Sequence, residues 1–318
     1  MALTTTFTTL AGCIHPVVSA PMGGSAGGEL AAAVSNAGGY GFVGGGPGQT
    51  EWLEPQLRIA AEKATRPWGA GLLTWAADDA KVGRLLEYGP ASVFLGFGDP
   101  TPYADRIHAA GAQLFVQVTD LDEARQALDA GADVVIAQGV DAGGHSGGGR
   151  GTMSFVPVVV DLAGSVPVLA AGGVVDGRGL AASLALGAAG ALVGTRFQAC
   201  PEAVVPEAVQ KALLTGGGDD TVLSTVLDAA RRSAWPSRYP GRSLRNAFLD
   251  RWEGRVNELR GDEAALAEYA DGVARQDRDY LAVWASAAVD LITELTPAAE
   301  IVAEIAGDAE EILTRLPG

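Results

Sequence analysis

His145 is the residue of this sequence best suited to acid–base chemistry. It stands in DVVIAQGVDAGGHSGGGRG, residues 133–151, where an apolar run precedes a loop in which seven glycines surround the histidine. The apolar run predicts a buried strand. The glycines let main-chain N–H groups approach a ligand and leave the imidazole facing it. With an ordinary pKa of about 6.5, this imidazole could remove a proton next to an electron-withdrawing group.

The remaining candidates for catalysis are weaker. His15 precedes the first predicted strand and His108 lies in a helix-like segment, so we expect a structural role and a solvated helix face. No nucleophile elbow accompanies His145, which argues against a Ser-His-Asp triad. The sequence has no HExxH and no nearby His/Cys cluster, so we expect no metal site.

Several polar or glycine-rich groups follow other apolar runs. Gln117 and Gln138 offer amides that could hydrogen-bond a heteroaromatic ring such as a flavin. The turn at residues 20–24 reads APMGG, the turn at 170–174 reads AAGGV, and 193–196 reads VGTR. Bare glycine N–H groups and the Thr195 hydroxyl suit a phosphate. These groups together predict a phosphate-bearing cofactor.

The elements that would position these groups alternate regularly between apolar runs and Ala/Leu-rich helical segments. This rhythm predicts parallel βαβ units, and eight of them predict a (β/α)8 TIM barrel whose site lies at the C-terminal strand ends. An open doubly wound sheet is disfavoured because the first turn, PMGGSAGG, lacks a clean GxGxxG context. The expected strands are 17–22, 41–45, 68–74, 92–96, 113–118, 133–138, 167–171 and 191–194.

Composition restricts the partners and the compartment. The 318 residues carry a net charge of −16, so we expect no binding to nucleic acid or to anionic membranes. No apolar run reaches the roughly 18 residues that a membrane span needs, and the N-terminus lacks the features of a signal peptide. Cys13 and Cys200 show neither metal-ligand nor disulfide spacing, which favours a reduced, cytoplasmic setting.

The composition changes after residue 200. We expect residues 1–200 to form the barrel, 201–290 a mostly helical lid region, and 291–318 a C-terminal helix that packs back on the barrel. Residues 262–290 in the lid region and 297–316 in the C-terminal segment have the spacing of amphipathic helices. The Trp- and Arg-rich segment 235–252 fits a lid, a subunit interface of a homodimer, or ordinary packing of an irregular segment.

The motifs resemble the nitronate monooxygenase family, formerly 2-nitropropane dioxygenases, of FMN-dependent TIM barrels. The matching pieces are APMGG at 20–24, AQGVDAGGH at 137–145, PVLAAGGVVDGRG at 167–179 and LGAAGALVGTRF at 186–197. The resemblance implies FMN, with residues 21–23 along its ring, Gln138 and Gly143 in contact with it, and His145 as the catalytic histidine. It also implies that Gly172, Gly173, Gly194 and Thr195 hold the phosphate. The expected cofactor-binding residues are Ala20, Pro21, Met22, Gly23, Gln117, Gln138, Gly143, Gly144, Ala171, Gly172, Gly173, Val193, Gly194 and Thr195.

The resemblance further implies oxidation of alkyl nitronates by O2 to a carbonyl compound and nitrite. Where the substrate is the neutral nitroalkane, His145 would remove its α-proton. Two other functions stay open from the sequence. One is an NAD(P)H-dependent flavin reductase acting on enoyl thioesters or quinones. The other is a non-enzymatic sensor that binds FMN while His145 has a structural role.

Overall fold

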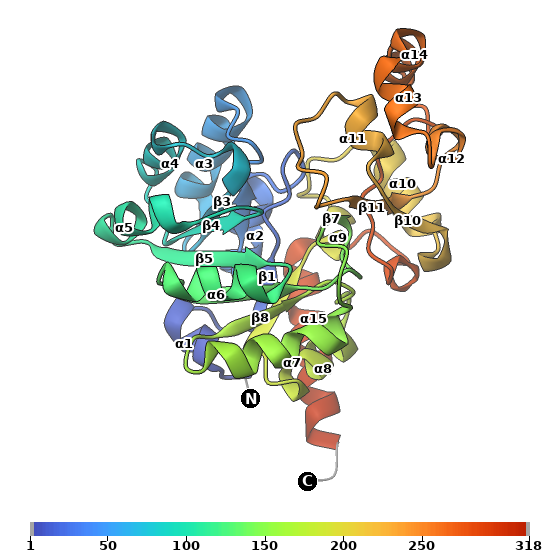
Figure 1. The fold of residues 1–318 in the computed structure, drawn as a ribbon. Coiled ribbons are helices and arrows are strands. Elements are labelled where there is room, and N and C mark those ends of the chain that lie inside the picture. Colours follow the sequence, from blue (N-terminus) through green and yellow to red (C-terminus); the bar gives the residue numbers. More distant parts are fainter. Residues whose placement is uncertain (1–2, 316–318) are drawn as a thin grey trace.

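Eight parallel strands form the barrel in the computed structural model, which describes residues 3–315 (Figure 1). Their order in the sheet is β1-β9-β8-β6-β5-β4-β3-β2. The bridge between Val18 and Tyr40 closes the ring, and Tyr40 N–H donates to the Val17 carbonyl at 2.9 Å. The prediction of a TIM barrel is confirmed. The strands are β1 (Val17–Ser19), β2 (Phe42–Gly44), β3 (Gly69–Leu73), β4 (Ser92–Gly96), β5 (Gln113–Val118), β6 (Val134–Gln138), β8 (Val168–Ala171) and β9 (Gly190–Val193).

Aromatic side chains fill the N-terminal end of the barrel interior. Tyr40 and Phe115 stack with ring centroids 5.6 Å apart, and Phe7 meets each of them edge-on at 6.1 Å. Phe7 comes from α1 (Thr6–Ala11), which precedes the first strand. Such aromatic packing buries much apolar area and leaves little room for a ligand at that end. Open space within the barrel is therefore expected at the opposite end, where the strands finish.

Helices surround the strands and cover their outer side chains. In β6, for example, Val134 and Ile136 face the barrel interior, while Val135 and Ala137 pack toward the helices. This alternation follows from the two-residue period of a strand. Aspartate side chains cap the N-termini of three of the helices. The covering helices are α2 (Gly28–Asn36), α3 (Thr50–Lys63), α4 (Asp79–Leu86), α5 (Thr101–Ala109), α6 (Leu121–Asp129), α7 (Thr152–Ala163) and α8 (Gly177–Ala185).

The C-terminal helix α15 (Ala298–Arg315) packs against α8 and α2, where Ile301 and Ile305 are buried. Its start, directly after Pro297, agrees with the predicted helix 297–316, whose last residue, Leu316, lies outside the described range. No helix within residues 3–315 is long and apolar enough to cross a bilayer.

The chain between β9 and α15 forms a lobe beside the barrel, coloured yellow to orange in Figure 1. Its short sheet has the antiparallel order β10-β11-β7 and takes β7 (Gly144–His145) from the glycine-rich loop of the barrel. The loop that carries His145 is thus tied to both parts of the molecule. The other elements of this stretch are α9 (Thr195–Gln198), α10 (Glu207–Thr215), η2 (Gly218–Asp220), β10 (Thr221–Ser224), α11 (Val226–Ala230), β11 (Gly241–Leu244), α12 (Ala247–Trp252), α13 (Val256–Gly261), α14 (Glu263–Ala274) and η3 (Val289–Leu291), and η1 (Thr74–Ala76) follows β3.

The predicted helix 262–290 is wrong in its second half. The helix α14 ends at Ala274, and the chain after it is largely irregular up to η3. Leu281, Val283 and Ala285 are buried, whereas the residues between them are partly exposed, which is the two-residue period of an extended segment. Leu244 N–H donates to the Val283 carbonyl at 2.9 Å. Pairing with β11 therefore holds this segment extended despite its helical composition.

Candidate functional site

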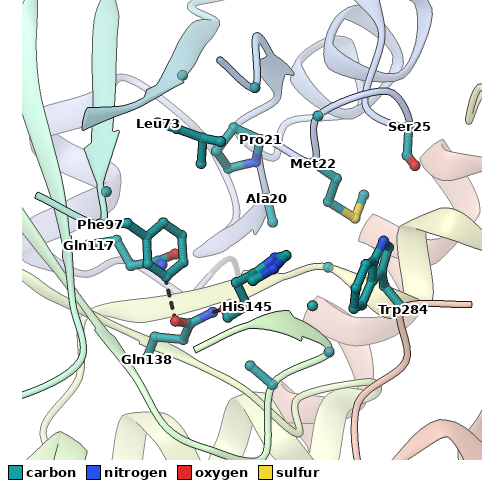
Figure 2. A pocket seen from close by; sticks show the side chains of 18 of the residues that line it. Ala20, Pro21, Met22, Ser25, Leu73, Phe97, Gln117, Gln138, His145 and Trp284 are labelled. Atoms are coloured by element: carbon teal, nitrogen blue, oxygen red, sulfur yellow. Dashed lines mark hydrogen bonds between the residues drawn. The ribbon is translucent and has the colours of Figure 1, made fainter. Parts of the chain in front are cut away.

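A cavity of about 540 Å³ opens where the barrel strands end (Figure 2). The structure brings thirteen of the fourteen predicted cofactor-binding residues to its wall, together with His145. Val193 is the exception, because its side chain is fully buried between β9 and the surrounding helices. The predicted residues on the wall are Ala20, Pro21, Met22, Gly23, Gln117, Gln138, Gly143, Gly144, His145, Ala171, Gly172, Gly173, Gly194 and Thr195.

The turn after β8 presents bare backbone to this cavity. Gly172 and Gly173 have φ of +104° and +72°, which side chains other than glycine rarely adopt. The N–H group of Gly173 donates no hydrogen bond within the described residues. The nearby Thr195 Oγ1 accepts from Ser286 N–H at 3.1 Å, which leaves the hydroxyl proton of Thr195 to donate. The arrangement offers the Gly173 N–H and the Thr195 hydroxyl as donors to an anion.

A chain of amide hydrogen bonds links β5, β6 and the His145 loop. Gln117 Nε2 donates to Gln138 Oε1 at 3.1 Å, and Gln138 Nε2 donates to the His145 carbonyl at 3.0 Å; Figure 2 marks the first with a dashed line. Both glutamines are buried. Because Gln138 uses its carbonyl oxygen within the protein, Gln117 is the glutamine whose carbonyl oxygen has no partner among the described residues.

His145 forms a buried pair with Asp228. The imidazole Nε2 lies 2.9 Å and 3.1 Å from the two Asp228 carboxylate oxygens, and the side chains are only 8% and 6% exposed. Arg231 Nη2 donates to Oδ1 of the same carboxylate at 2.8 Å. Burial lowers the pKa of His145 below its ordinary value, and this outweighs the opposing effect of Asp228. The imidazole is therefore neutral near pH 7, as a base must be.

Aromatic rings cover the imidazole and form the roof of the cavity. Trp235 stacks on His145 with centroids 3.6 Å apart and an interplanar angle of 5°, and Trp284 lies at 5.1 Å. Trp75 and Phe97 contact Trp235 in turn, at 5.5 Å and 4.9 Å. Phe97 has a φ of +67°, so its backbone is strained where its ring meets the roof. These contacts seal one face of the base from water.

Two residues fasten the segment that carries Trp235 to the barrel. Tyr239 Oη donates to Glu123 at 2.6 Å, and Arg238 forms ion pairs with Glu123 and Asp120 at the start of α6. Trp235 thus lies over the cavity as part of a fastened loop. Within segment 235–252, Trp235 is the residue that lines the cavity, and the lid, the subunit interface and ordinary packing all stay predictions for the segment as a whole.

The other two histidines lie outside the cavity lining. His108 Nε2 lies 3.0 Å from Asp133 Oδ2 on the outer surface, and its side chain is 39% exposed. His15 is partly buried, and its Nδ1 has no hydrogen-bond partner among residues 3–315. Within residues 3–315 no group of three or more His, Cys, Asp or Glu side chains could hold a metal ion.

Sequence reasoning missed Asp228, Arg231 and Trp284. Asp228 is 83 residues from His145, in the unremarkable helical stretch VLDAA, and no spacing connects the two. Trp284 lies in the segment that was expected to be helical, so the sequence did not predict that it reaches the cavity. Only Trp235 had a signal, because it begins the Trp- and Arg-rich segment.

Comparisons with known proteins agree with this architecture. The model of the nitronate monooxygenase family matches residues 4–80 and 74–308. The chain is 34% identical to a nitronate monooxygenase of Neurospora crassa, over 94% of this chain and 90% of that one. Among solved structures, it is similar to FabK from Thermotoga maritima, with 30% identity, a TM-score of 0.86 and 98% of each chain covered. The nitroalkane oxidase of Streptomyces ansochromogenes is 29% identical, with a TM-score of 0.84 over 98% of this chain and 99% of that one. The chain therefore belongs to the nitronate monooxygenase family of oxidoreductases.

Proposed function

We propose that this protein binds FMN and oxidises alkyl nitronates with O2 to carbonyl compounds and nitrite. The observation that carries the proposal is the buried His145, paired with Asp228, in a cavity that glycine backbone also lines. The family relationship and the likeness to a nitroalkane oxidase support the same reaction class.

The residues present fit FMN. A volume of about 540 Å³ lies within the range of cofactor sites. The free N–H group of Gly173 and the Thr195 hydroxyl would hold the phosphate in the turn formed by Gly172 and Gly173, and Gln117 would hydrogen-bond the ring edge. At Gly194, a Cβ would approach only Ala20 and Met22, both at 3.7 Å, so glycine there keeps the cavity open. Bound FMN would supply the electron acceptor for the substrate and the site at which O2 is reduced.

Each residue of the roof then has a task toward the substrate. A nitronate is an anion, so a positive charge in the cavity would attract it. Arg231 is the one Lys or Arg residue in the cavity lining within residues 3–315. A neutral nitroalkane has to lose its α-proton first, and the neutral imidazole of His145 is the base available for that step. Trp235 and Trp284 keep water from the imidazole, which maintains its lowered pKa.

A second candidate is an NAD(P)H-dependent flavin reductase acting on an enoyl thioester or a quinone. The likeness to FabK, at a TM-score of 0.86 over nearly the whole chain, favours it. In such an enzyme the same cavity would admit a nicotinamide as the electron donor, and His145 would serve as a proton donor.

Anaerobic reduction of the purified protein separates these functions. The visible spectrum first shows whether flavin is bound. Propyl-2-nitronate should then bleach the flavin absorbance, while NADH and NADPH should leave it nearly unchanged. Bleaching by a nicotinamide alone would establish the reductase instead. A protein whose flavin responds to none of the three donors would be a flavin-binding sensor, and a colourless protein that takes up no FMN would refute the cofactor.

A further inference from the structure

We propose that Asp228 is a positioning residue that holds the proton of neutral His145 on Nε2 and so leaves the Nδ1 lone pair as the base. The position of the proton follows from the geometry around His145. Its consequence for turnover rests on the proposed function, and a separate measurement tests each of the two.

The carboxylate geometry determines which nitrogen carries the proton. Both Asp228 oxygens lie within hydrogen-bond distance of Nε2, at 2.9 Å and 3.1 Å. Arg231 donates to one of them at 2.8 Å, and a guanidinium can only donate. Since the carboxylate acts as the acceptor on both sides, Nε2 has to be the donor. The neutral imidazole, with a single ring proton, then has a bare Nδ1.

The other nitrogen reaches the cavity. Nδ1 of His145 has no hydrogen bond within the described residues, and it is not among the buried unpartnered atoms, although the residue lines the cavity. Trp235 lies flat on the ring at 3.6 Å, and a ring flip would have to sweep through that space. The stacking therefore keeps Nε2 on Asp228 and Nδ1 on the side of a bound substrate.

Arg231 makes this arrangement sensitive to one substitution. In Asp228→Asn, the guanidinium still requires an oxygen, so it selects the amide oxygen and turns the NH2 group toward His145. The NH2 group can only donate, so Nε2 becomes the acceptor and the proton moves to Nδ1. A nearly isosteric change thus removes the base from the cavity without removing the histidine. The same inversion of a tautomer is the known effect of Asp→Asn beside a catalytic histidine.

The test is 15N NMR of the protein as purified, with its bound flavin and labelled histidine, at a pH where His145 is neutral. The sequence has three histidines, and His145→Gln assigns the signal by removing it. Nε2 should show the shift of a protonated nitrogen in the wild type and of an unprotonated one in Asp228→Asn. A wild-type proton on Nδ1, or the same tautomer in both proteins, would overturn the proposal. The wild-type spectrum alone shows which nitrogen of His145 carries the proton, even if the variant does not fold.

Two further variants sharpen the test. In Asp228→Asn combined with Arg231→Met, the amide is free to present its oxygen, so the proton should return to Nε2. His108 and Asp133 form a similar pair on the surface, with Nε2 3.0 Å from Oδ2. Asp133→Asn should therefore leave the His145 signals and all turnover unchanged. A change at His145 in that control would mean that the shifts do not report the local pair.

Measurements of turnover provide the second test of the proposal. Asp228→Asn should lower kcat for a neutral nitroalkane by at least about 100-fold, since general-base catalysis is lost. Oxidation of the preformed nitronate should change by less than about fivefold, because no proton has to be removed. Equal losses on both substrates would contradict positioning. If the tautomer inverts but no nitro compound is oxidised by the wild type, the proposed function fails and the assignment of the proton stands.

Discussion

The barrel and the segment between β9 and α15 contribute different kinds of groups to the cavity. The barrel half supplies the backbone of the glycine turns at the ends of β1, β2, β8 and β9, together with uncharged side chains such as those of Met22, Gln117 and Gln138. The roof, between β9 and α15, contributes side chains: Arg231, Trp235 and Trp284 line the cavity, and Asp228 holds its histidine. The loop with Gly144 and His145 belongs to both halves, because it leaves β6 and pairs with β11.

This division separates two tasks. Backbone N–H groups recognise what is common to any phosphate-bearing cofactor, so the barrel half suits a conserved ligand. Charged and aromatic side chains distinguish substrates and set the basicity of the imidazole, so the roof suits the reaction. Substitutions in the barrel half should therefore weaken cofactor binding and abolish turnover of every substrate. Substitutions in the roof should lower the turnover of some substrates more than that of others.

The largest expected effect comes from the barrel half. In Gly172→Ala, the residue would keep a φ of +104°, and its Cβ would lie 2.9 Å from the Gly139 carbonyl oxygen, so the turn has to move. We expect almost complete loss of FMN, measured as the ratio of flavin absorbance to protein after gel filtration. The matched control is Gly148→Ala, where a Cβ meets nothing within 4 Å and FMN should be retained. Full flavin content in Gly172→Ala would show that this turn does not hold the cofactor.

The next effect isolates the base in the roof. His145→Gln should keep its flavin but oxidise a neutral nitroalkane about 100- to 10,000-fold more slowly, the usual contribution of a general base. The preformed nitronate should lose far less, since it arrives deprotonated. Oxygen consumption with both substrates checks this. A parallel loss on the two substrates, or loss of flavin, would assign His145 to binding rather than to proton removal.

The sequence predicted the two halves with unequal success, and the physical reason is the range of the interactions. The barrel strands are short apolar runs closed by glycine, so their signal is local, and the glycine turns lie beside the strands that carry them. Asp228 meets His145 across 83 residues, which no local pattern records. The segment after Ala274 has helical composition, but the pairing of Val283 with Leu244 decides its conformation.

A smaller effect concerns pH. Burial lowers the pKa of His145, Asp228 raises it and Arg231 lowers it. Since the neutral imidazole is the base, kcat/KM for a neutral nitroalkane should be level near pH 7 and fall as the pH drops through a pKa below the ordinary value of about 6.5. Arg231→Met removes the positive charge, so the fall should begin at higher pH. The pH–rate profiles of the wild type and of Arg231→Met test this. If the acidic limb of the profile does not move in the variant, His145 is not the group whose titration produces it.

The smallest expected effect concerns the hydrogen bond that anchors the Trp235 segment to α6. It tests whether this anchor contributes to substrate binding. Tyr239→Phe removes the hydrogen bond to Glu123 at 2.6 Å while its ring can still pack on Phe97 at 5.0 Å. Such a bond to a charged group contributes about 1.5–3 kcal/mol at most, part of which Arg238 retains through its own pairing with Glu123. We expect KM to rise a few-fold, with flavin content and kcat nearly unchanged. Tyr280→Phe is the matched control, because it loses a similar bond to Glu268 away from the cavity lining. If both variants raise KM equally, the effect is one of general stability, and the anchor of the roof has no special part in holding substrate.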